Sequence, residues 1–475
     1  MDLYDNIKDV LSKKGINLTV GNMYDYMEIW KSWYKGNVAD FHFYEEVVNG
    51  KTVKKERLTM NMPKKLCEDI SKLLWTEKTR IELSNAKATK RLWEVLDSKE
   101  NSFTVNFPIH LEKSLAIGTG ALIEYKNSQA KTIIDYVLGD VIIPYKYTNS
   151  YINGLVTISR FSENARKKKI YYTHITYHEY DGTIYRRYNE LYKSENETEL
   201  GKEIVFTSMF PNIKELEEIE TDTPRFQIFK TNLANNLDLN SPMGISILAN
   251  SIDRFKGIDI KYDSFFREFK LGKKRILVDP TAMKATTSAD ENGNIRHVQY
   301  FDSNDEAYVG INGMEGQPVK DVDFSLRAQE HIDAINAELN WLSANVGLGN
   351  NFYKFDGNGL KTATEVISEN ADAFRTKVHY DIITNDVIYD LVKVICEMEG
   401  IKTNKITIIP DDSIIEDKNT EQIRALQEVN QGVKSKKSYL METKGMTEEE
   451  AIKELESIQE EKLGNQEAFG FISEE

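Results

Sequence analysis

The stretch from Gly244 to Lys270 constrains the fold more than any other part of this 475-residue sequence. Its apolar residues advance by threes and fours without interruption, which is the spacing of one helix face. The series is Ile245, Leu248, Ile252, Phe255, Ile258, Tyr262, Phe265 and Phe269. Acidic and basic residues alternate on the opposite face, from Asp253 to Arg267. At about 1.5 Å per residue, the stretch predicts a helix of about 40 Å.

Two further helices are expected after this one. Apolar residues from Leu326 to Val346 are spaced by four and three, which predicts a second amphipathic helix. Residues 271–325 between the two helices contain short strand-like runs separated by Asn-Gly and Asp/Asn clusters, which predict a small β-module. A third helix is expected from about Thr362 to Glu399. The tail from Asn419 onward is helical in pattern, with an expected N-cap at Thr447.

The N-terminal half has a different texture. The first hundred residues show helical periodicity interrupted by polar breaks. From Phe103 to about Arg187, alternation and β-branched runs predict strands, with hairpin turns at Asn153-Gly154 and Asp181-Gly182. The acidic segment 194–223 lacks apolar periodicity and is expected to be an exposed connection. The sequence therefore predicts an α+β protein in which a sheet-rich part follows a helical one.

Composition excludes several classes of protein. The formal charge is −15, from 76 acidic and 61 basic residues, so the chain as a whole repels nucleic acid and is not expected to bind DNA tightly. Cys67 and Cys396 lie far apart and outside any CxxC spacing, which argues against a disulfide framework or a thiolate metal site. No run has the length of a membrane span and MDLYDNIKDV does not resemble a secretory signal, so we expect an intracellular protein.

The sequence lacks the catalytic motifs of the common enzyme classes. The GNGLKT segment departs from the GxxxxGK[ST] spacing of a phosphate loop, and no HExxH, GxSxG, kinase-like or dinucleotide-binding set is present. His174 and His178 would share one face of a strand, but nothing nearby completes a metal ligand set, so packing roles are favoured. No catalytic, cofactor-binding or metal-binding residues are predicted.

Two basic runs are candidates for contact with a DNA backbone. The first, Arg166 to Lys169, is better explained as a solvated strand edge. The second includes Lys270, Lys273, Lys274 and Arg275, where the long helix gives way to the β-module. For this second run, contact with DNA or with a partner protein and simple solvation are equally compatible with the sequence.

The segment GLGNNFYKFDGNGLKTATEV, from Gly347 to Val366, places four glycines and three aromatic residues between two helices. Together with DVIIPYKYTNSYINGLV, SPMGISILANSIDRFKGID, INAELNWLSANVGLGNNFYKFDGNGLKTATEVISEN and VKSKKSYLMETKGMTEEEAIKELESIQEE, it resembles the portal proteins of tailed bacteriophages, specifically the group from phages of Gram-positive hosts. The likeness covers nearly the whole chain. GLKTATEV is its most specific phrase.

The resemblance implies a portal-protein fold that assembles as a ring of about twelve subunits. It implies the following parts: a wing at 1–235, a first stem helix at 236–270, a clip at 271–325, a second stem helix at 326–346, a tunnel loop at 347–360, a long wing- and crown-connecting helix at 361–400 and a crown at 401–475. Double-stranded DNA would pass through the central channel during packaging and ejection. The implied partners are the terminase large subunit, the head-tail adaptor, and the major capsid and scaffolding proteins, without a membrane. The protein would be assembled in the host bacterial cytoplasm and located at a capsid vertex of the virion.

Within the tunnel loop, the resemblance points to a set of residues that would face DNA: Asn350, Asn351, Phe352, Tyr353 and Lys354. Glycines would let such a loop move, and a single Lys354 per subunit would make a weak, repeated phosphate contact. The alternative is that the aromatic residues plug the core of a turn between helices, and Phe355 is the one we expect to be buried.

The two stem helices carry apolar seams that a monomer would not bury completely, which favours assembly into a ring. We also hypothesise that charges between Asp253 and Arg267 link adjacent subunits. Two alternatives stay open: a metal-dependent enzyme acting on nucleic acid, which would need clustered carboxylates, and a different phage scaffold such as an adaptor.

Overall fold

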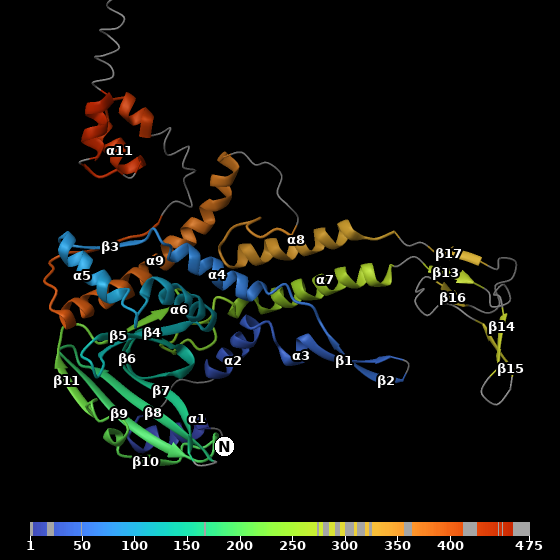
Figure 1. Ribbon diagram of the computed structural model, residues 1–475, viewed down its shortest axis with the longest axis horizontal. Helices are drawn as coiled ribbons and strands as arrows, with labels where there is room; N and C mark the ends of the chain where they lie inside the picture. The colour runs from blue at the N-terminus through green and yellow to red at the C-terminus, as the bar shows by residue number, and fades with distance from the viewer. Residues whose placement is uncertain are drawn as a thin grey trace, which may run out of the picture.

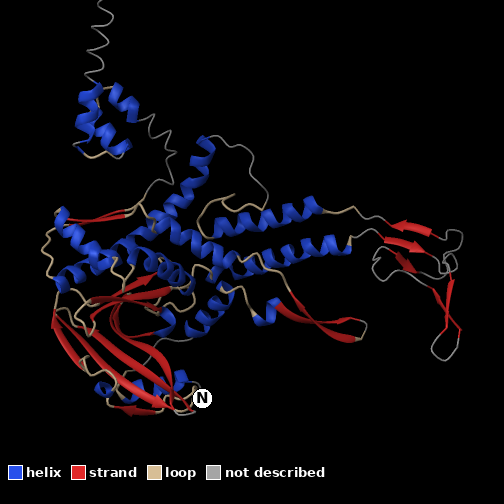
Figure 2. Ribbon diagram, in the orientation of Figure 1, coloured by secondary structure: helices blue, strands red, loops and turns tan. Residues whose placement is uncertain are grey.

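The computed structural model describes residues 3–16, 23–48, 50–165, 168–272, 275–278, 285–289, 295–299, 308–310, 319–322, 325–355, 363–411, 425–444, 446–448 and 450–458. It is 45% helical and 26% strand, so the predicted α+β class is confirmed. A mixed body occupies one side of the molecule, and a pair of long helices extends from it (Figures 1 and 2). We call these two helices the arm.

Two antiparallel sheets form much of the body. The larger sheet has the strand order β10-β9-β8-β7-β6, with β11 also paired to β9, and the smaller has the order β12-β4-β5. Their strands are β4 (Thr119–Lys126), β5 (Thr132–Leu138), β6 (Ile142–Thr148), β7 (Tyr151–Ala165), β8 (Lys168–Tyr180), β9 (Ile184–Ser194), β10 (Lys202–Ile204), β11 (Leu216–Glu220) and β12 (Phe226–Lys230). Figure 2 shows the smaller sheet between the larger one and the helices of the body.

Helices and one small ribbon complete the body, and a second ribbon projects from it below the arm (Figure 1). The helices are α1 (Leu3–Lys13), α2 (Met23–Tyr34), α3 (Ala39–His42), α4 (Met62–Leu74), α5 (Ala86–Leu96) and α6 (Phe103–Ile117). The projecting ribbon pairs β1 (Phe43–Val48) with β2 (Lys51–Glu56), and the ribbon of the body pairs β3 (Arg80–Leu83) with β18 (Ile406–Ile409). The β3–β18 ribbon therefore joins chain segments from opposite ends of the sequence.

The arm consists of α7 (Ile252–Leu271) and α8 (Ala328–Asn345), which run side by side (Figure 1). Between them in sequence lie β13 (Arg275–Val278), β14 (Ala285–Ala289), β15 (Ile295–Gln299), β16 (Tyr308–Gly310) and β17 (Val319–Val322). The long helix α9 (Ala363–Glu399) follows, and then α11 (Lys436–Lys444). Short 3-10 turns occupy Gly139–Val141, Phe206–Ser208 and Ala249–Ser251.

One apolar core connects the body to the arm. In the body, Trp75 contacts Phe103 and Phe107 at ring-centroid distances of 5.5 and 5.0 Å. The same core includes Phe255 and Ile258 of α7, and it continues into α8 and α9 through Ile335, Leu339, Leu342, Ile388, Leu391 and Ile395. Continuous burial of this kind joins the arm firmly to the body.

Several predictions for the N-terminal half were wrong. Residues 103–117 form the helix α6 rather than strands, and their burial at Phe103, Phe107, Leu111 and Leu115 has a helical period of four. The first hundred residues contain β1, β2 and β3 as well as helices. The segment 194–223, expected to be a connection, supplies β10 and β11 to the edge of the large sheet. Edge strands of this kind are short and highly charged, so periodicity does not reveal them.

The two predicted hairpin turns had different outcomes. Asp181-Gly182 connects β8 to β9, with Gly182 at φ +105°, as predicted. Asn153-Gly154 instead lies within β7, beside a register irregularity opposite β6. A Cβ at Gly154 would come within 2.7 Å of the Lys146 Cβ, so glycine is required there by close packing rather than by a turn. The actual turn is at Asn149 and Ser150.

The helix predictions were closer. The first long helix begins at Ile252 rather than Gly244. The residues before it pack against the body, with Leu248 followed by the 3-10 turn Ala249–Ser251. The second and third predicted helices correspond to α8 and α9 within two residues. Thr447 caps the final helical segment as predicted, because its Oγ1 accepts the N–H of Glu450 at 3.4 Å and Glu450 accepts the N–H of Thr447 at 2.9 Å.

Candidate functional site

Ion pairs tie the two helices of the arm together. Glu338 of α8 lies 2.8 Å from Lys261 and 3.5 Å from Arg254, both on α7. Farther from the body, Arg327 donates through Nε and Nη2 to the two carboxylate oxygens of Glu268, at 3.1 and 2.8 Å. These hydrogen bonds lower the pKa of Glu268 to about 2. The arm is therefore fixed by polar pairs along its length as well as by its apolar seam.

Two aspartates of α7 hold the segment that follows β2. Asp259 accepts the N–H of Met60 at 2.9 Å through Oδ1, and its Oδ2 lies 3.1 Å from His42 Nε2. The N–H of Val38 donates to His42 Nδ1 at 2.9 Å, so Nε2 carries the imidazole proton and donates to Asp259. Asp263 accepts the N–H of Leu58 at 3.3 Å. His42, Asp259 and Asp263 are buried.

These contacts account within the chain for three of the charges that we hypothesised to link adjacent subunits. Asp259, Lys261 and Asp263 are paired within the chain, because α7 has α8 on one side and the segment around Met60 on another. Asp253 is different, since its side chain is 93% exposed and pairs with the neighbouring Lys256.

The turn after α8 is closed by glycine. Gly347 has φ +76°, the N–H of Leu348 reaches back to the carbonyl of Ser343 at 2.9 Å, and the N–H of Gly347 donates to the carbonyl of Ala344 at 3.1 Å. This is the Schellman pattern of a helix end, and Leu348 is fully buried behind it. Thr376 of α9 donates to the carbonyl of Gly347 at 2.6 Å, which attaches the turn to the next helix.

Beyond Gly349, the backbone is held along one face of α8. Three side chains of that helix accept the N–H groups of every second residue. Asn340 accepts from Asn351 at 3.0 Å, Ser343 from Tyr353 at 3.2 Å and Asn336 from Phe355 at 2.8 Å. The acceptors are spaced by four and three, so they share one helix face. Residues 351–355 therefore lie in a fixed path against α8.

The expected tunnel-loop residues divide into two groups. Tyr353 is buried, and its hydroxyl donates to Asp69 of α4 at 2.9 Å, so its side chain lies within the protomer rather than on a channel surface. Phe352 is half-buried against the same core. Asn350 and Lys354 are exposed, and Asn351 is half-buried at φ +65°. The remaining expected loop residues, 356–360, lie outside the described residues.

Phe355, the aromatic residue that we expected to be buried, is half-buried rather than fully enclosed. Its ring packs against Tyr262 and Phe265 of α7, at centroid distances of 6.2 and 5.8 Å. Tyr353 is the fully enclosed member of the set. The turn thus contributes aromatic side chains to both the arm and the body.

The second basic run is only partly described. Lys270 is exposed in the last turn of α7 and lines a hollow of about 570 Å³ that it shares with Glu46, Glu56 and Arg267. Lys273 and Lys274 lie outside the described residues. Arg275 begins β13, where its backbone pairs with Val322.

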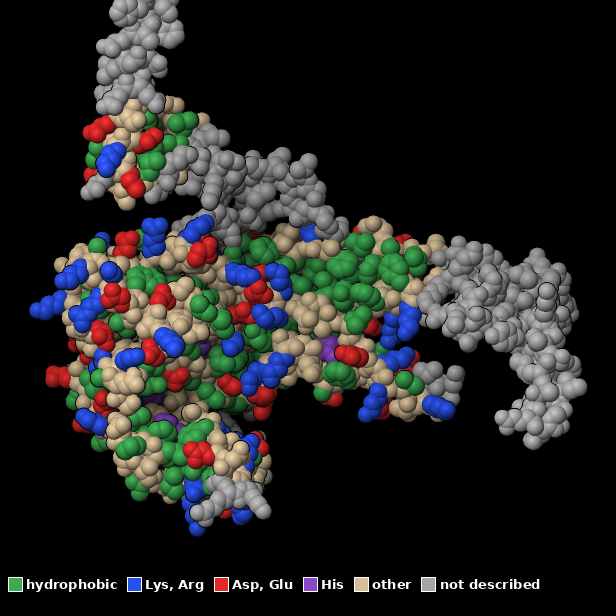
Figure 3. All heavy atoms as spheres, viewed as in Figure 1, with side chains coloured by type: hydrophobic (Ala, Val, Ile, Leu, Met, Phe, Trp, Pro, Cys, Tyr) green, Lys and Arg blue, Asp and Glu red, His purple; other side chains and the backbone are tan. Residues whose placement is uncertain are grey.

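Exposed apolar side chains follow the arm and α9. Trp341 of α8 is 60% exposed and Ile382 of α9 is 58% exposed. Ile260 is half-exposed on α7, on the side opposite Ile258 and Tyr262. Val378, Phe266 and Phe269 are also exposed. Figure 3 shows hydrophobic side chains gathered over the arm, in contrast to the mixed charges over the body.

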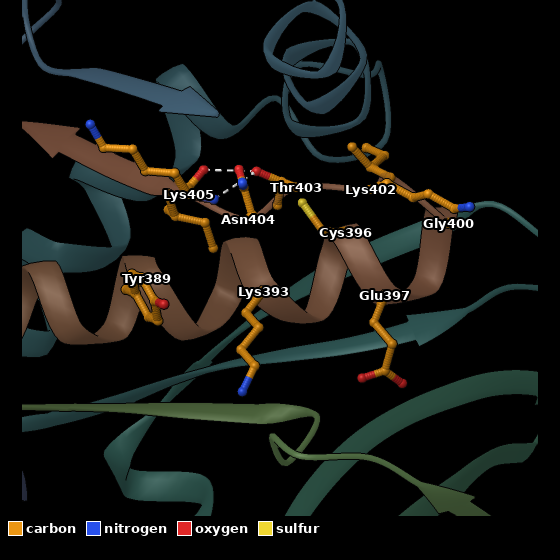
Figure 4. A pocket seen from close by; sticks show the side chains of 11 residues that line it. Tyr389, Lys393, Cys396, Glu397, Gly400, Lys402, Thr403, Asn404 and Lys405 are labelled. Carbon is orange, nitrogen blue, oxygen red and sulfur yellow. Dashed lines mark hydrogen bonds between the residues drawn. The ribbon is translucent and has the colours of Figure 1, made fainter. Parts of the chain in front are cut away.

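A hollow of about 440 Å³ lies where α9 ends. Figure 4 shows Tyr389, Lys393 and Glu397 pointing away from the following strand segment, and Lys402 and Lys405 pointing in different directions. Cys396 lines the hollow, and burial raises the pKa of its thiol to about 11. Because the amines diverge, the hollow does not form a convergent anion site.

The structure also places the two histidines considered as metal ligands. His174 Nε2 bonds Asn189 at 3.0 Å, and His178 Nδ1 lies 2.7 Å from the Tyr185 hydroxyl. Within the described part of the chain, no three His, Cys, Asp or Glu side chains are grouped as a metal site. The described helices include none that is long and apolar enough to span a bilayer.

Comparison with known proteins identifies the family. The family model described as phage portal protein, SPP1 Gp6-like, matches residues 21–468. The chain therefore belongs to the phage portal proteins, a family of structural rather than catalytic components of the phage capsid that act in DNA packaging. No curated protein matches the chain.

Proposed function

We propose that copies of this chain form a closed ring at one capsid vertex, around a channel through which double-stranded DNA enters during packaging and leaves during ejection. The exposed apolar side chains on α7, α8 and α9 are the observation that carries this proposal. Hydrophobic side chains gathered at a surface, as over the arm in Figure 3, mark a protein interface. Because much of this surface lies on the arm, which extends from the body, neighbouring copies repeated around an axis would cover it.

In this ring, the arm helices are the stem, and residues 271–325, between the two helices in sequence, form the clip. The clip is the platform for the terminase motor and later for the head-tail adaptor. Residues 1–235 are the wing, which meets the capsid and scaffolding proteins, and residues 401–475 form the crown. The position of the strands β13–β17 beyond the paired helices (Figure 1) supports this division.

The turn after α8 faces the channel through its exposed residues. Asn350 and Lys354 are the candidates for DNA contact, and the expected loop continues to residue 360. Lys354 makes no ion pair with any residue in the described ranges, so its ammonium group is available for phosphate. One lysine per copy on an otherwise acidic protein gives weak contacts that leave DNA free to move.

Native mass spectrometry of designed variants tests assembly. The wild-type protein is expected at an integer multiple of 54.7 kDa, near twelve copies. Ile382→Asp and Trp341→Asp place a charge on the exposed apolar surface and are expected to yield monomers. Val105→Asp is the matched control, because Val105 is 60% exposed on α6 of the body. A monomeric wild-type protein at high concentration, or turnover of DNA by it, would contradict the proposal.

A further inference from the structure

A cavity with a polar floor lies between the two sheets of the body, away from the arm. Its volume is about 360 Å³. The floor is formed by β7, β8 and β9 of the large sheet, and one wall by Ile123, Tyr125 and Asp135 of the small sheet. The opposite wall is formed by Phe206, Phe210 and Ile213. We call this space the sheet cavity.

The floor of the sheet cavity consists of side chains that alternate along three adjacent strands. Thr157, Thr176 and Asn189 form one row across β7, β8 and β9, because their backbones are paired in register. Ser159 and His174 form the next paired row, and His178 pairs with Arg187. An inward-facing sheet surface is ordinarily apolar. Such a concentration of polar groups points to a binding surface.

Most of these polar groups satisfy one another. His174, Thr176 and Asn189 are joined by contacts of 3.0 to 3.2 Å, and Asn189 donates to the carbonyl of Lys214 at 3.1 Å. His178 lies between Tyr185 and Thr157. Arg187 is the exception, because it is buried and its Nε has no hydrogen-bond partner among the described residues. An incompletely satisfied buried polar group is often completed by water or a ligand.

The charged groups around the cavity do not attract an anion. Arg187 pairs with Glu217 at 2.8 Å, so its charge is already compensated. Burial lowers the pKa of His178 to about 3 and also lowers the pKa of His174, which keeps both imidazoles neutral at pH 7. Asp135 lies exposed at the rim. The Asp135 carboxylate opposes an anion, and the neutral polar floor suits a guest without negative charge that carries hydrogen-bonding groups.

The opposite wall supplies apolar contact. Phe206 and Phe210 pack over His174, with ring centroids 5.2 and 5.8 Å from it. Aromatic walls of this kind hold an apolar side chain. At the mouth, the exposed Ser159 hydroxyl and the Asp135 carboxylate offer a donor and an acceptor to a backbone amide.

We propose that the sheet cavity binds a short uncharged peptide segment of a partner polypeptide, with an apolar side chain against Phe206 and Phe210, a backbone carbonyl oxygen at the Nε of Arg187, and a backbone amide at Asp135 and Ser159. The size of the cavity suits one residue and its two flanking amides. This proposal does not depend on ring assembly, because all the residues that line the cavity belong to one chain. It adds a docking site for a second protein to the body.

Ligand-observed NMR tests the proposal with N-acetyl-phenylalaninamide as the probe. Saturation transfer from the wild-type protein to the phenyl and acetyl groups is expected. Ser159→Phe fills the mouth of the cavity and is expected to abolish the transfer. Ser162→Phe is the matched control, because Ser162 is exposed on the same strand and points to the other sheet face. Equal transfer from wild-type protein and Ser159→Phe would overturn the proposal.

Two further measurements keep the test decisive. Inorganic phosphate is not expected to displace the probe, and displacement at constant ionic strength would show an anion site instead. If Ser159→Phe does not melt cooperatively, Arg187→Gln replaces it, with Arg186→Gln as control. Arg186 is half-exposed and pairs with Asp181 and Glu218 outside the cavity, so only Arg187→Gln is expected to weaken the signal. An equal signal from both arginine variants would overturn the proposal.

Discussion

The hydroxyl of Tyr353 donates a hydrogen bond to Asp69 at 2.9 Å, which joins the turn after α8 to α4 of the body. Burial and the nearby Asp69 carboxylate raise the pKa of the Tyr353 phenol well above its usual range. Asp69 also pairs with Lys65. A residue that the sequence suggested as a channel contact is thus an anchor of the turn. The exposed residues on either side of Tyr353, Asn350 and Lys354, remain available to line a channel.

We predict that Tyr353→Phe destabilises the protein by about 0.5–1.5 kcal/mol, because it removes one hydrogen bond and keeps the ring packing. Urea unfolding followed by fluorescence measures the change. Tyr151→Phe removes a hydroxyl from a tyrosine that is 56% exposed and is expected to change the unfolding free energy by less than about 0.5 kcal/mol. Equal effects of the two substitutions would mean that the contact with Asp69 does not hold the turn.

Asp259→Ala is expected to destabilise the protein by about 3–5 kcal/mol. The substitution leaves the buried His42 and the N–H of Met60 without their acceptor. Asp253→Ala, on the same helix but with a 93% exposed carboxylate, is expected to change the unfolding free energy by less than about 0.5 kcal/mol. Differential scanning calorimetry of the pair checks this prediction, and similar melting temperatures would contradict it.

The pH dependence of stability is expected to include a contribution from His178. Its folded-state pKa of about 3 lies below the unfolded value, so the unfolded chain takes up a proton first as the pH falls. The contribution of His178 to the unfolding free energy is therefore fully present above about pH 6.5 and is lost as the pH falls toward 3, with a limiting slope of about 1.4 kcal/mol per pH unit. His178→Gln removes this slope, and its unfolding free energy should fall less steeply than that of the wild-type protein. His379→Gln, at an exposed position on α9, is the matched control.

Lys354→Glu is expected to leave ring assembly intact and to reduce the number of DNA-filled heads. The reversed charge would repel phosphates at each copy of the turn, while the path of residues 351–355 is still held by Asn336, Asn340 and Ser343. Counting filled and empty particles by electron microscopy measures the effect. Lys99→Glu, on the exposed surface of the body, is the control. Unchanged packaging with Lys354→Glu would exclude this lysine from the channel.

Local sequence patterns predicted the long helices well, because α8 and α9 each show one apolar face for many turns. The same patterns gave wrong predictions where a residue contacts another that is distant in the sequence, and where a strand is only a few residues long. The hydroxyl of Tyr353 is held by Asp69, which lies 284 residues away in the sequence, and no local pattern contains that information. The charged residues of α7 were predicted to be exposed. The segment around Met60, which contacts Asp259, is also distant from α7 in the sequence.

In the sequence, the residues of the polar floor are recognisable only because they occupy alternate positions of their strands. Thr157 and Ser159, His174 and Thr176, and Arg187 and Asn189 each occupy alternate positions of a strand. We interpreted the histidines as packing residues, and their hydrogen bonds agree with that. What the sequence could not provide was the strand register that brings the three pairs together.

We propose above that copies of this chain surround a channel. Electron microscopy of the purified protein, with particle images averaged in the view down the particle axis, shows whether they do. We predict a closed ring of about twelve copies with a central hole. A compact monomer or dimer without a hole, persisting at high protein concentration, would contradict the account.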